Sequence, residues 1–188
     1  MNETTYLTNH LLIAMPTLED PNFFHTVTYI CEHNADGAMG IVINRPLELS
    51  LGEVVEHMEL PIVAPQYKKS PIFLGGPVQP ERGFVLHVPT ETEWEASLLI
   101  TKHLSLTTSR DVISSIANGD GPHRFLIALG YAGWGPGQLE REMTANAWLS
   151  GPVDPKILFD TPIEQRWLNA AALLGVDLNL LSSEAGHA

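Results

Sequence analysis

The chain has 188 residues, of which 44% are hydrophobic and 17% are charged, and its formal net charge is −12 at pH 7. This length fits one domain with a substantial buried core, and the hydrophobic content excludes an intrinsically disordered chain. Lys and Arg number 10 against 22 Asp and Glu, and they are scattered along the sequence. Because nucleic-acid binding depends on clustered basic residues that neutralise phosphates, direct binding to DNA or RNA is disfavoured.

The cysteine content and the first residues indicate the compartment. Cys31 is the single cysteine, so no disulfide can form within the chain, and this suits a reducing cytosol. Residues 1–5 include no basic residue of the kind that opens a secretory signal, and no apolar run approaches the roughly 20 residues that span a membrane. We expect a cytoplasmic protein with no membrane segment. The charged fraction lies below the roughly 25% of typical domains, which favours a partner surface or weak homo-oligomerisation.

The N-terminal part of the chain predicts strands. The apolar run Leu11–Met15, closed by Pro16, is typical of a buried strand. Residues 24–32 and 38–44 predict two more strands, which the turn at 34–37 joins into a hairpin. We expect Arg45-Pro46 to end this hairpin.

A short helix is predicted next. Ser50 and Glu53 have the spacing of a capping box, which predicts a helix from there to about Met58. A proline-containing loop occupies residues 61–71. Apolar residues then predict short strands at 72–74, 83–88 and 98–101.

Helices and strands follow each other in the second half. A helix is predicted over 110–118, with Thr108 or Ser109 as its N-cap and Gly119 at its end. After it, the pattern predicts a strand at 124–129, a helix at 136–145 and an extended segment at 148–153.

The C-terminal segment predicts one more helix. Thr161-Pro162-Ile163-Glu164 combines an N-cap residue, a proline at the first helical position and a glutamate at the third. Apolar residues then fall on one helical stripe that Gly175 closes, namely Ile163, Trp167, Ala171 and Leu174. Residues 182–188 are expected to be a frayed tail.

An early hairpin followed by mixed strands and helices predicts a single α+β domain with a mixed β-sheet. The sequence contains no internal repeat, low-complexity run or linker that would divide it. We expect one domain over residues 1–188, with a folded core from about residue 7 to about residue 181 and short frayed ends.

The segment 130–142 carries four glycines and a proline around Trp134. A phosphate-binding loop would need Lys-Ser/Thr after Gly137, and a dinucleotide fingerprint would need glycine where Gln138 stands, so neither motif is present. One interpretation is a tight strand-to-helix turn in which Trp134 packs into the core. The other is a binding surface, because exposed loops often carry function.

Two other motifs stand at predicted strand ends, Asn44-Arg45-Pro46 and Gly75-Gly76-Pro77. Strand ends often converge on one edge of a sheet, where sites form. Asn44 and Arg45 could offer a directional amide and a guanidinium fork to a ligand. Alternatively, Asn44 stabilises its own turn and Arg45 pairs with a surface acid.

Reactive residues form no recognisable catalytic pattern. Cys31 and His33 would share one strand face, but nothing nearby supplies an oxyanion site, so a buried inert thiol is the favoured interpretation. Glu53 and His57 could share a metal, although an ordinary helix-surface pair explains them as well. No zinc spacing and no serine-hydrolase elbow is present. We assign no catalytic residue, no metal and no cofactor.

Four segments in order resemble the YqgE/AlgH family of bacterial proteins. The resemblance extends from about residue 11 to about residue 181 and rests on Leu12–Pro16 with Asp20-Pro21-x-Phe23, Gly37–Pro46, Gly75–Val78, and Gly130–Trp134 with Gly137–Glu140 and Asn146-x-Trp148-Leu149.

The resemblance implies a single domain with a bifurcated mixed sheet that is bent into a pseudo-barrel and flanked by helices. It also implies a bacterial cytosolic protein without an established enzymatic activity. Some members carry the label of transcriptional regulator, linked to alginate production, which we interpret as an indirect role because the charge of this chain disfavours DNA binding. The family supplies no agreed catalytic residues to transfer.

The leading hypothesis is a regulatory protein that acts through a protein partner. The alternative is an enzyme or small-molecule-binding protein whose site lies at the same surface. In either case the predicted surface consists of Asn44, Arg45, Gly75, Gly76, Trp134 and Gln138.

Overall fold

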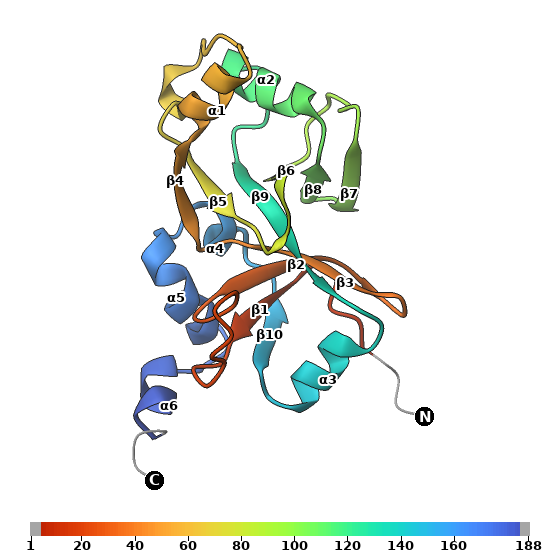
Figure 1. Ribbon diagram of the computed structural model, residues 1–188, viewed down its shortest axis with the longest axis vertical. Coiled ribbons are helices and arrows are strands. Elements are labelled where there is room, and N and C mark those ends of the chain that lie inside the picture. The colour runs from red at the N-terminus through yellow and green to blue at the C-terminus, as the bar shows by residue number, and fades with distance from the viewer. Residues whose placement is uncertain (1–4, 185–188) are drawn as a thin grey trace.

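The computed structural model describes residues 5–184 as ten strands and six α-helices (Figure 1). The strands are β1 (His10–Ala14), β2 (Val27–Asn34), β3 (Gly37–Val42), β4 (Pro46–Ser50), β5 (Pro71–Leu74), β6 (Val78–His87), β7 (Ser97–Thr101), β8 (Leu104–Thr107), β9 (Phe125–Trp134) and β10 (Trp148–Pro152). The helices are α1 (Leu51–His57), α2 (Arg110–Asn118), α3 (Gln138–Thr144), α4 (Pro155–Phe159), α5 (Arg166–Ala172) and α6 (Leu178–Glu184). Short 3-10 turns occupy Pro65–Tyr67 and Ile163–Gln165.

One branched sheet contains all ten strands. Its main path runs β10-β1-β2-β3-β9-β6-β8-β7, and the β4–β5 pair joins it at the side through a parallel β5–β9 ladder. The other ladders are antiparallel, and the long strand β9 pairs with β3, β5 and β6. The sheet curls into a half-barrel (Figure 1). The predicted single α+β domain with a bifurcated mixed sheet is therefore confirmed.

The sheet is buried on both faces around β9. Leu126 and Ala128 belong to the core that α4, α5 and α6 cover, whereas Ile127 between them belongs to the core under α1 and α2. Alternate strand residues point to opposite faces, so a strand with helices on both sides needs a continuous apolar run. This explains the sequence of residues 125–129. A third core lies around Trp134, Trp148 and α3.

Glycines stand where the connection from β5 to β6 crosses β9. A Cβ on Gly75 would lie 2.3 Å from the Gly130 carbonyl oxygen, and one on Gly76 would lie 2.1 Å from the Tyr131 carbonyl carbon. Gly130 has a φ of +74°, which side chains disfavour. The glycine motifs at 75–76 and 130 therefore permit a backbone crossing that any larger residue would obstruct.

The first half of the chain confirms the hairpin and the capping box. Strands β2 and β3 pair in antiparallel fashion, and the Ser50 and Glu53 side chains each bond to the other's backbone N–H. The hairpin ends at Val42, before Arg45-Pro46, as expected, but Pro46 then begins strand β4, which was not predicted, and pairs there with Phe73. A proline is tolerated as the first residue of a strand, where its missing N–H costs no ladder bond.

The strands of the central region are longer and more numerous than predicted. Strand β9 does not stop at residue 129 but continues through the glycine segment to Trp134, because glycines there let β3 and β6 approach it. Strand β8 (Leu104–Thr107) was not predicted. The strand-to-helix turn lies later, at residues 135–137, and α3 begins at Gln138 after Gly137, whose φ is +69°.

The α2 boundaries agree with the prediction, but its capping differs. Ser109 occupies the N-cap position without a capping bond, because its hydroxyl accepts from the Ala96 N–H and donates to Asp111. Gly119 closes the helix with a φ of +85°.

The C-terminal segment departs most from the prediction. An unpredicted helix, α4, precedes Thr161, whose hydroxyl donates to the Lys156 carbonyl oxygen instead of capping a helix. The helix α5 begins only at Arg166, and Leu174 at the end of the predicted stripe is 37% exposed. Residues 182–184 of the expected tail belong to α6, and residues 185–188 lie outside the described residues. No helix within residues 5–184 is long and apolar enough to cross a membrane.

Candidate functional site

The predicted residues Asn44 and Arg45 bond to backbone groups of the neighbouring loop. The Asn44 side chain accepts from the Val27 N–H at 2.8 Å and donates to the His25 carbonyl oxygen at 2.9 Å. Arg45 donates through Nη1 to the Asn22 carbonyl oxygen at 2.7 Å and through Nη2 to that of Phe24 at 3.2 Å. Both side chains hold the loop that leads into β2, and Arg45 pairs with carbonyl groups rather than with an acid.

The backbone brings two of the predicted motifs together. The Leu74 N–H donates to the Arg45 carbonyl oxygen, and the Val42 N–H donates to that of Gly75, each at 2.8 Å. Gly75 in turn donates to the Leu129 carbonyl oxygen. Strand ends 44–45 and 75–76 therefore meet at the branch of the sheet. This agrees with the expectation that strand ends often converge at one place in a sheet.

Trp134 and Gln138 belong to a different cluster, which surrounds the Glu142 carboxylate. Its Oε2 accepts from the indole N–H groups of Trp134 and Trp148, each at 2.9 Å, and its Oε1 accepts from the Gln138 side chain at 3.1 Å. The Phe23 ring stacks on Trp134 with centroids 5.9 Å apart. Glu142 therefore ties α3 to the ends of β9 and β10.

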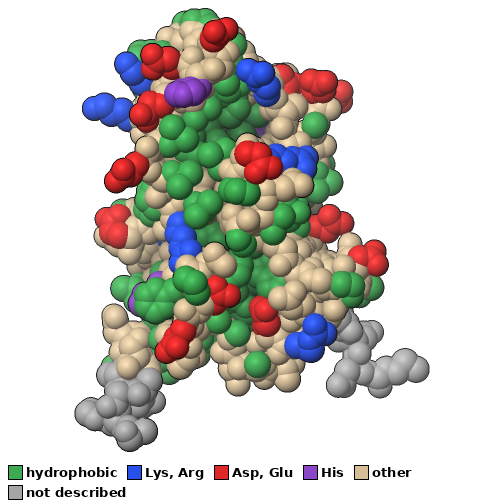
Figure 2. Space-filling view, viewed as in Figure 1, with side chains coloured by type: hydrophobic (Ala, Val, Ile, Leu, Met, Phe, Trp, Pro, Cys, Tyr) green, Lys and Arg blue, Asp and Glu red, His purple; other side chains and the backbone are tan. Residues whose placement is uncertain are grey.

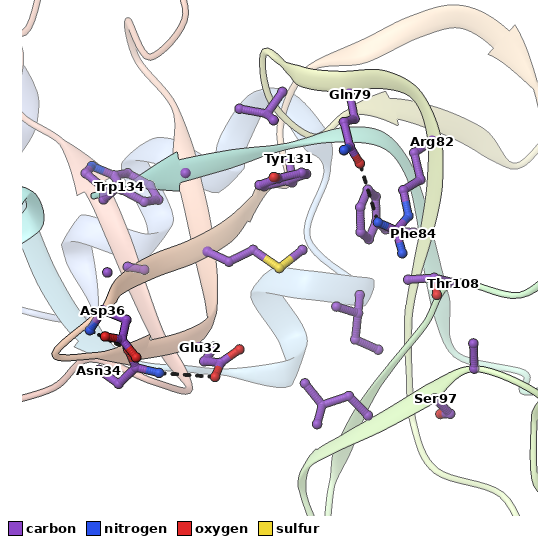
Figure 3. A pocket seen from close by; sticks show the side chains of 18 residues that line it. Glu32, Asn34, Asp36, Gln79, Arg82, Phe84, Ser97, Thr108, Tyr131 and Trp134 are labelled. Carbon is purple, nitrogen blue, oxygen red and sulfur yellow. Dashed lines mark hydrogen bonds between the residues drawn. The ribbon is translucent and has the colours of Figure 1, made fainter. Parts of the chain in front are cut away.

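A groove of about 1020 Å³ lies between the β2–β3 hairpin and strands β6, β7 and β8, and we call it the hairpin groove (Figure 3). Of the six predicted surface residues, only Trp134 lines it. Its apolar lining includes Met39, Val78, Phe84, Leu98, Leu106 and Tyr131, and its polar lining includes Glu32, Asn34, Asp36, Gln79, Arg82 and Thr108.

Aromatic contacts shape one wall of the hairpin groove. The Tyr131 ring meets the Phe84 ring edge-on, with centroids 5.7 Å apart and planes at 70°. Arg82 lies over the same Phe84 ring, with its Cζ 5.3 Å from the centroid. Tyr131 projects from β9 toward this wall, and the acidic hairpin residues lie across from it (Figure 3). The groove therefore has an apolar aromatic side and an acidic side.

Strand β7 forms the rim of the hairpin groove and is an edge of the sheet. Within the described strands it pairs only with β8, with Leu98 opposite Leu106. Leu98 is 48% exposed and lines the groove, whereas Leu99 is 63% exposed and does not line it. Hydrophobic side chains are also prominent on the face of the molecule shown in Figure 2, with acidic side chains around them. The rim thus offers apolar side chains and unpaired backbone groups.

The candidate reactive residues are engaged elsewhere. Cys31 is buried in the core, and burial raises the pKa of its thiol far above the usual range. The His33 ring accepts from the Leu7 N–H through Nδ1, so Nε2 carries the proton that it donates to Glu140 at 3.1 Å. Cys31 and His33 therefore do not form a catalytic pair.

Metal binding was considered for Glu53 and His57, and the described part of the chain assembles no metal site. No group of three His, Cys, Asp or Glu side chains within residues 5–184 has an arrangement that could hold a metal ion. Glu53 is occupied by its capping bonds with Ser50, which lower its carboxyl pKa, and the His57 ring bonds to the Glu53 carbonyl oxygen.

The residues that shape the groove carry little signal in the sequence. Tyr131 appeared within a glycine motif, whereas Phe84 and Leu98 stood in segments predicted only as strands, and Arg82 stood just before one of them. One signal was available in Leu98-Leu99-Ile100. In a short strand, consecutive apolar residues point to opposite faces, so this run indicates apolar side chains on both faces.

Comparison with known proteins gives consistent matches over the whole chain. The AlgH-like family model matches residues 11–179. A UPF0301 protein from Nitrosococcus oceani is 55% identical over 188 residues and covers 100% of both chains. The solution structure of AlgH from Pseudomonas aeruginosa matches with a TM-score of 0.78 and 52% identity over 100% of both chains. A crystal structure from Corynebacterium diphtheriae, at 18% identity and a TM-score of 0.75, covers 97% of this chain and 94% of its own and shares the fold.

Proposed function

This chain belongs to the AlgH-like family, and we propose that it is a cytoplasmic regulatory protein whose hairpin groove binds an extended segment of a partner protein. One observation carries the proposal, namely that the edge strand β7, which pairs only with β8 among the described strands, borders an apolar groove. The label of transcriptional regulator that some family members carry is then an indirect effect of this binding, because a net charge of −12 opposes contact with DNA.

The backbone of β7 supplies the first element of recognition. An edge strand presents a row of N–H and C=O groups that a second strand can pair with. Peptide segments commonly bind in this way, with backbone bonds giving affinity and pockets for alternate side chains giving specificity. Because β7 pairs only with β8 among the described strands, a partner segment can extend the sheet there.

The groove supplies the second element. Leu98 and Leu106 lie opposite each other in the β7–β8 ladder, and both line the groove together with Phe84. Alternate side chains of a strand added to β7 would point toward this apolar lining. We therefore expect at least one large apolar residue in the partner segment.

Charge specifies the partner further. Glu32 and Asp36 stand on the hairpin side of the groove, and Arg82 on the opposite side contacts Gln79. Complementary charges increase association rates and select the orientation of a partner. The chain is also strongly acidic overall, so we propose that basic residues flank the apolar residue of the partner.

The experiment is a nuclease-treated pull-down from bacterial lysate with three forms of the chain. The native protein and the Leu99→Asp variant are expected to retain the same partner, whereas Leu98→Asp is expected to lose it. The two variants add the same charge to adjacent positions of β7, but only Leu98 lines the groove. Equal retention or equal loss in both variants would reject the groove as the binding site.

Two further measurements separate the alternatives. Native mass spectrometry of freshly prepared protein detects a bound small molecule, and a non-protein mass that Leu98→Asp removes would favour a ligand-binding role at the same groove. Arg45→Ala tests the surface predicted from the sequence. If Arg45→Ala lost the partner while Leu98→Asp still retained it, the strand-end surface would be favoured over the groove.

A further inference from the structure

A second, smaller hollow lies away from the hairpin groove. Its volume is about 270 Å³, and it is formed by β5, the beginning of β9, α4 and the first residue of α5. It shares no lining residue with the hairpin groove. Apolar side chains including Phe73, Leu158 and Phe159 form much of its lining, together with the basic residues Arg124 and Arg166.

Arg166 is the unusual residue of this pocket. It is only 6% exposed, and its guanidinium donates through Nε to the Thr161 carbonyl oxygen at 3.0 Å and through Nη1 to that of Ile43 at 2.6 Å. Its Cζ lies 5.3 Å from the centre of the Phe73 ring. Within residues 5–184, its Nη2 makes no hydrogen bond and no carboxylate lies within ion-pair distance of it.

A buried guanidinium without a counter-ion is energetically costly. Removing a cation from water is offset only by paired charges or by hydrogen bonds, and here two carbonyl groups supply part of that compensation. The desolvation lowers the pKa of Arg166 to about 10, so the side chain remains charged at neutral pH. The pocket therefore contains a positive charge that the described residues do not neutralise.

The other charged groups of the pocket do not alter this balance. Arg124 donates through Nη2 to Asp160 at 2.6 Å, so its charge already has a partner. The His123 Nδ1 bonds to the Tyr67 hydroxyl at 2.8 Å. One uncompensated positive charge remains, which matches a singly charged anion better than a phosphate dianion.

We infer that this pocket binds a small organic carboxylate. One carboxylate oxygen accepts from the free Nη2 of Arg166, and the apolar body of the ligand lies against Phe73 and Phe159. The inference does not depend on the hairpin groove. A purely structural role for Arg166, as a clamp between α5 and the end of β3, would use Nε and Nη1 but neither Nη2 nor the hollow beside it.

The first test uses the native chain. Amide and Arg side-chain signals are followed by two-dimensional NMR during titration with benzoate, and separately with benzamide, its uncharged analogue. Saturable shifts that include the Arg166 Nε–H and the amides of Phe73 and Leu158, with benzoate only, are expected. Equal shifts with both compounds, or no shift around the pocket, would overturn the inference, and this outcome does not depend on whether any variant folds.

The second test uses matched variants. Arg166→Lys keeps the positive charge but loses the fork, and loss of a charge-assisted hydrogen bond is expected to weaken benzoate binding at least about tenfold. Arg82→Gln and Leu98→Asp change the hairpin groove alone and are expected to bind benzoate like the native chain. Unchanged binding in a folded Arg166→Lys protein would overturn the inference, whereas failure of the groove proposal would appear only in the pull-down.

Discussion

The crossing of the β5–β6 connection over β9 differs sharply from the rim formed by β7 and β8. At the crossing, Gly75 and Gly76 pack against backbone atoms of β9, and in a separate cluster Glu142 binds the indoles of Trp134 and Trp148. At the rim, β7 has an unpaired edge and Leu98 is 48% exposed. The glycines and tryptophans that stand out in the sequence thus serve internal packing. The exposed apolar surface at the rim is instead formed by residues that belong to no conspicuous motif. Changes at the crossing or in the Glu142 cluster should therefore alter stability, and changes at the rim should alter binding.

The largest effect is expected at Trp134. The Trp134→Ala variant loses a side chain that is 5% exposed and leaves Glu142 with fewer donors. We expect the free energy of unfolding to fall by about 3–5 kcal/mol, as measured by urea denaturation. Trp134→Phe keeps most of the packing and loses only the indole donor, so its loss should be nearer to about 1 kcal/mol. Similar losses in both variants would show that the hydrogen bond, rather than packing, dominates.

Gly75 tests the crossing itself. The added methyl group of Gly75→Ala would lie 2.3 Å from the Gly130 carbonyl oxygen, so β5 and β9 must separate. Overpacking of this kind is expected to cost about 3 kcal/mol. Gly83→Ala is the matched control on β6, because nothing lies within 4 Å of its added Cβ. If the two variants unfolded at the same urea concentration, the close approach would not explain the Gly75-Gly76 motif.

His87 gives the rim a pH dependence that sharpens the comparison. Its Nε2 accepts from the Thr107 hydroxyl, which also bonds to Ser97 on β7. Burial lowers the pKa of His87 below its ordinary 6.5, despite the opposing effect of its bond to the Val88 carbonyl oxygen. Between these two values the unfolded chain binds the proton and the folded chain does not, so acidification through this range removes stability.

The measurement is the free energy of unfolding at about pH 7 and at about pH 5 for the native chain and for His87→Gln. The native protein should lose more stability on acidification than the variant, because glutamine does not titrate. Parallel losses would mean that other groups account for the pH dependence.

The smallest effect on stability is expected from the rim substitution used in the pull-down. Leu98 is half exposed, so Leu98→Asp should change the free energy of unfolding by no more than about 0.5 kcal/mol, as is usual for surface positions. A large destabilisation would mean that Leu98 belongs to the core, and loss of a partner could then not be assigned to the groove.

Much of the fold followed from local patterns. The capping box of Ser50 and Glu53, the 28–42 hairpin and the α2 termination at Gly119 were all correct, since each depends on residues close in sequence. The errors arose where distant segments decide local structure. Strand β9 continues past residue 129 because β3 and β6 pair with it, and Thr161 is not a helix cap because α4 occupies its hydroxyl.

The candidate surfaces were less accessible to sequence reasoning. The strand ends at 44–45 and 75–76 do meet, as predicted, and their role in binding stays a prediction. The hairpin groove unites Glu32, Phe84 and Leu98 from three separate strands. The second pocket depends on Arg166, whose sequence context suggested only a helix.

The sequence by itself determined the family, the fold class and the positions of the local turns and caps, because these depend on motif order and on spacings of a few residues. The tertiary structure alone decided which polar groups are satisfied and which are left free. Glu142 accepts from two tryptophans and a glutamine, whereas the Nη2 of Arg166 bonds to nothing among the described residues. Hydrogen bonding and burial are properties of pairs of atoms brought together by folding, so residue type and spacing could not reveal this difference.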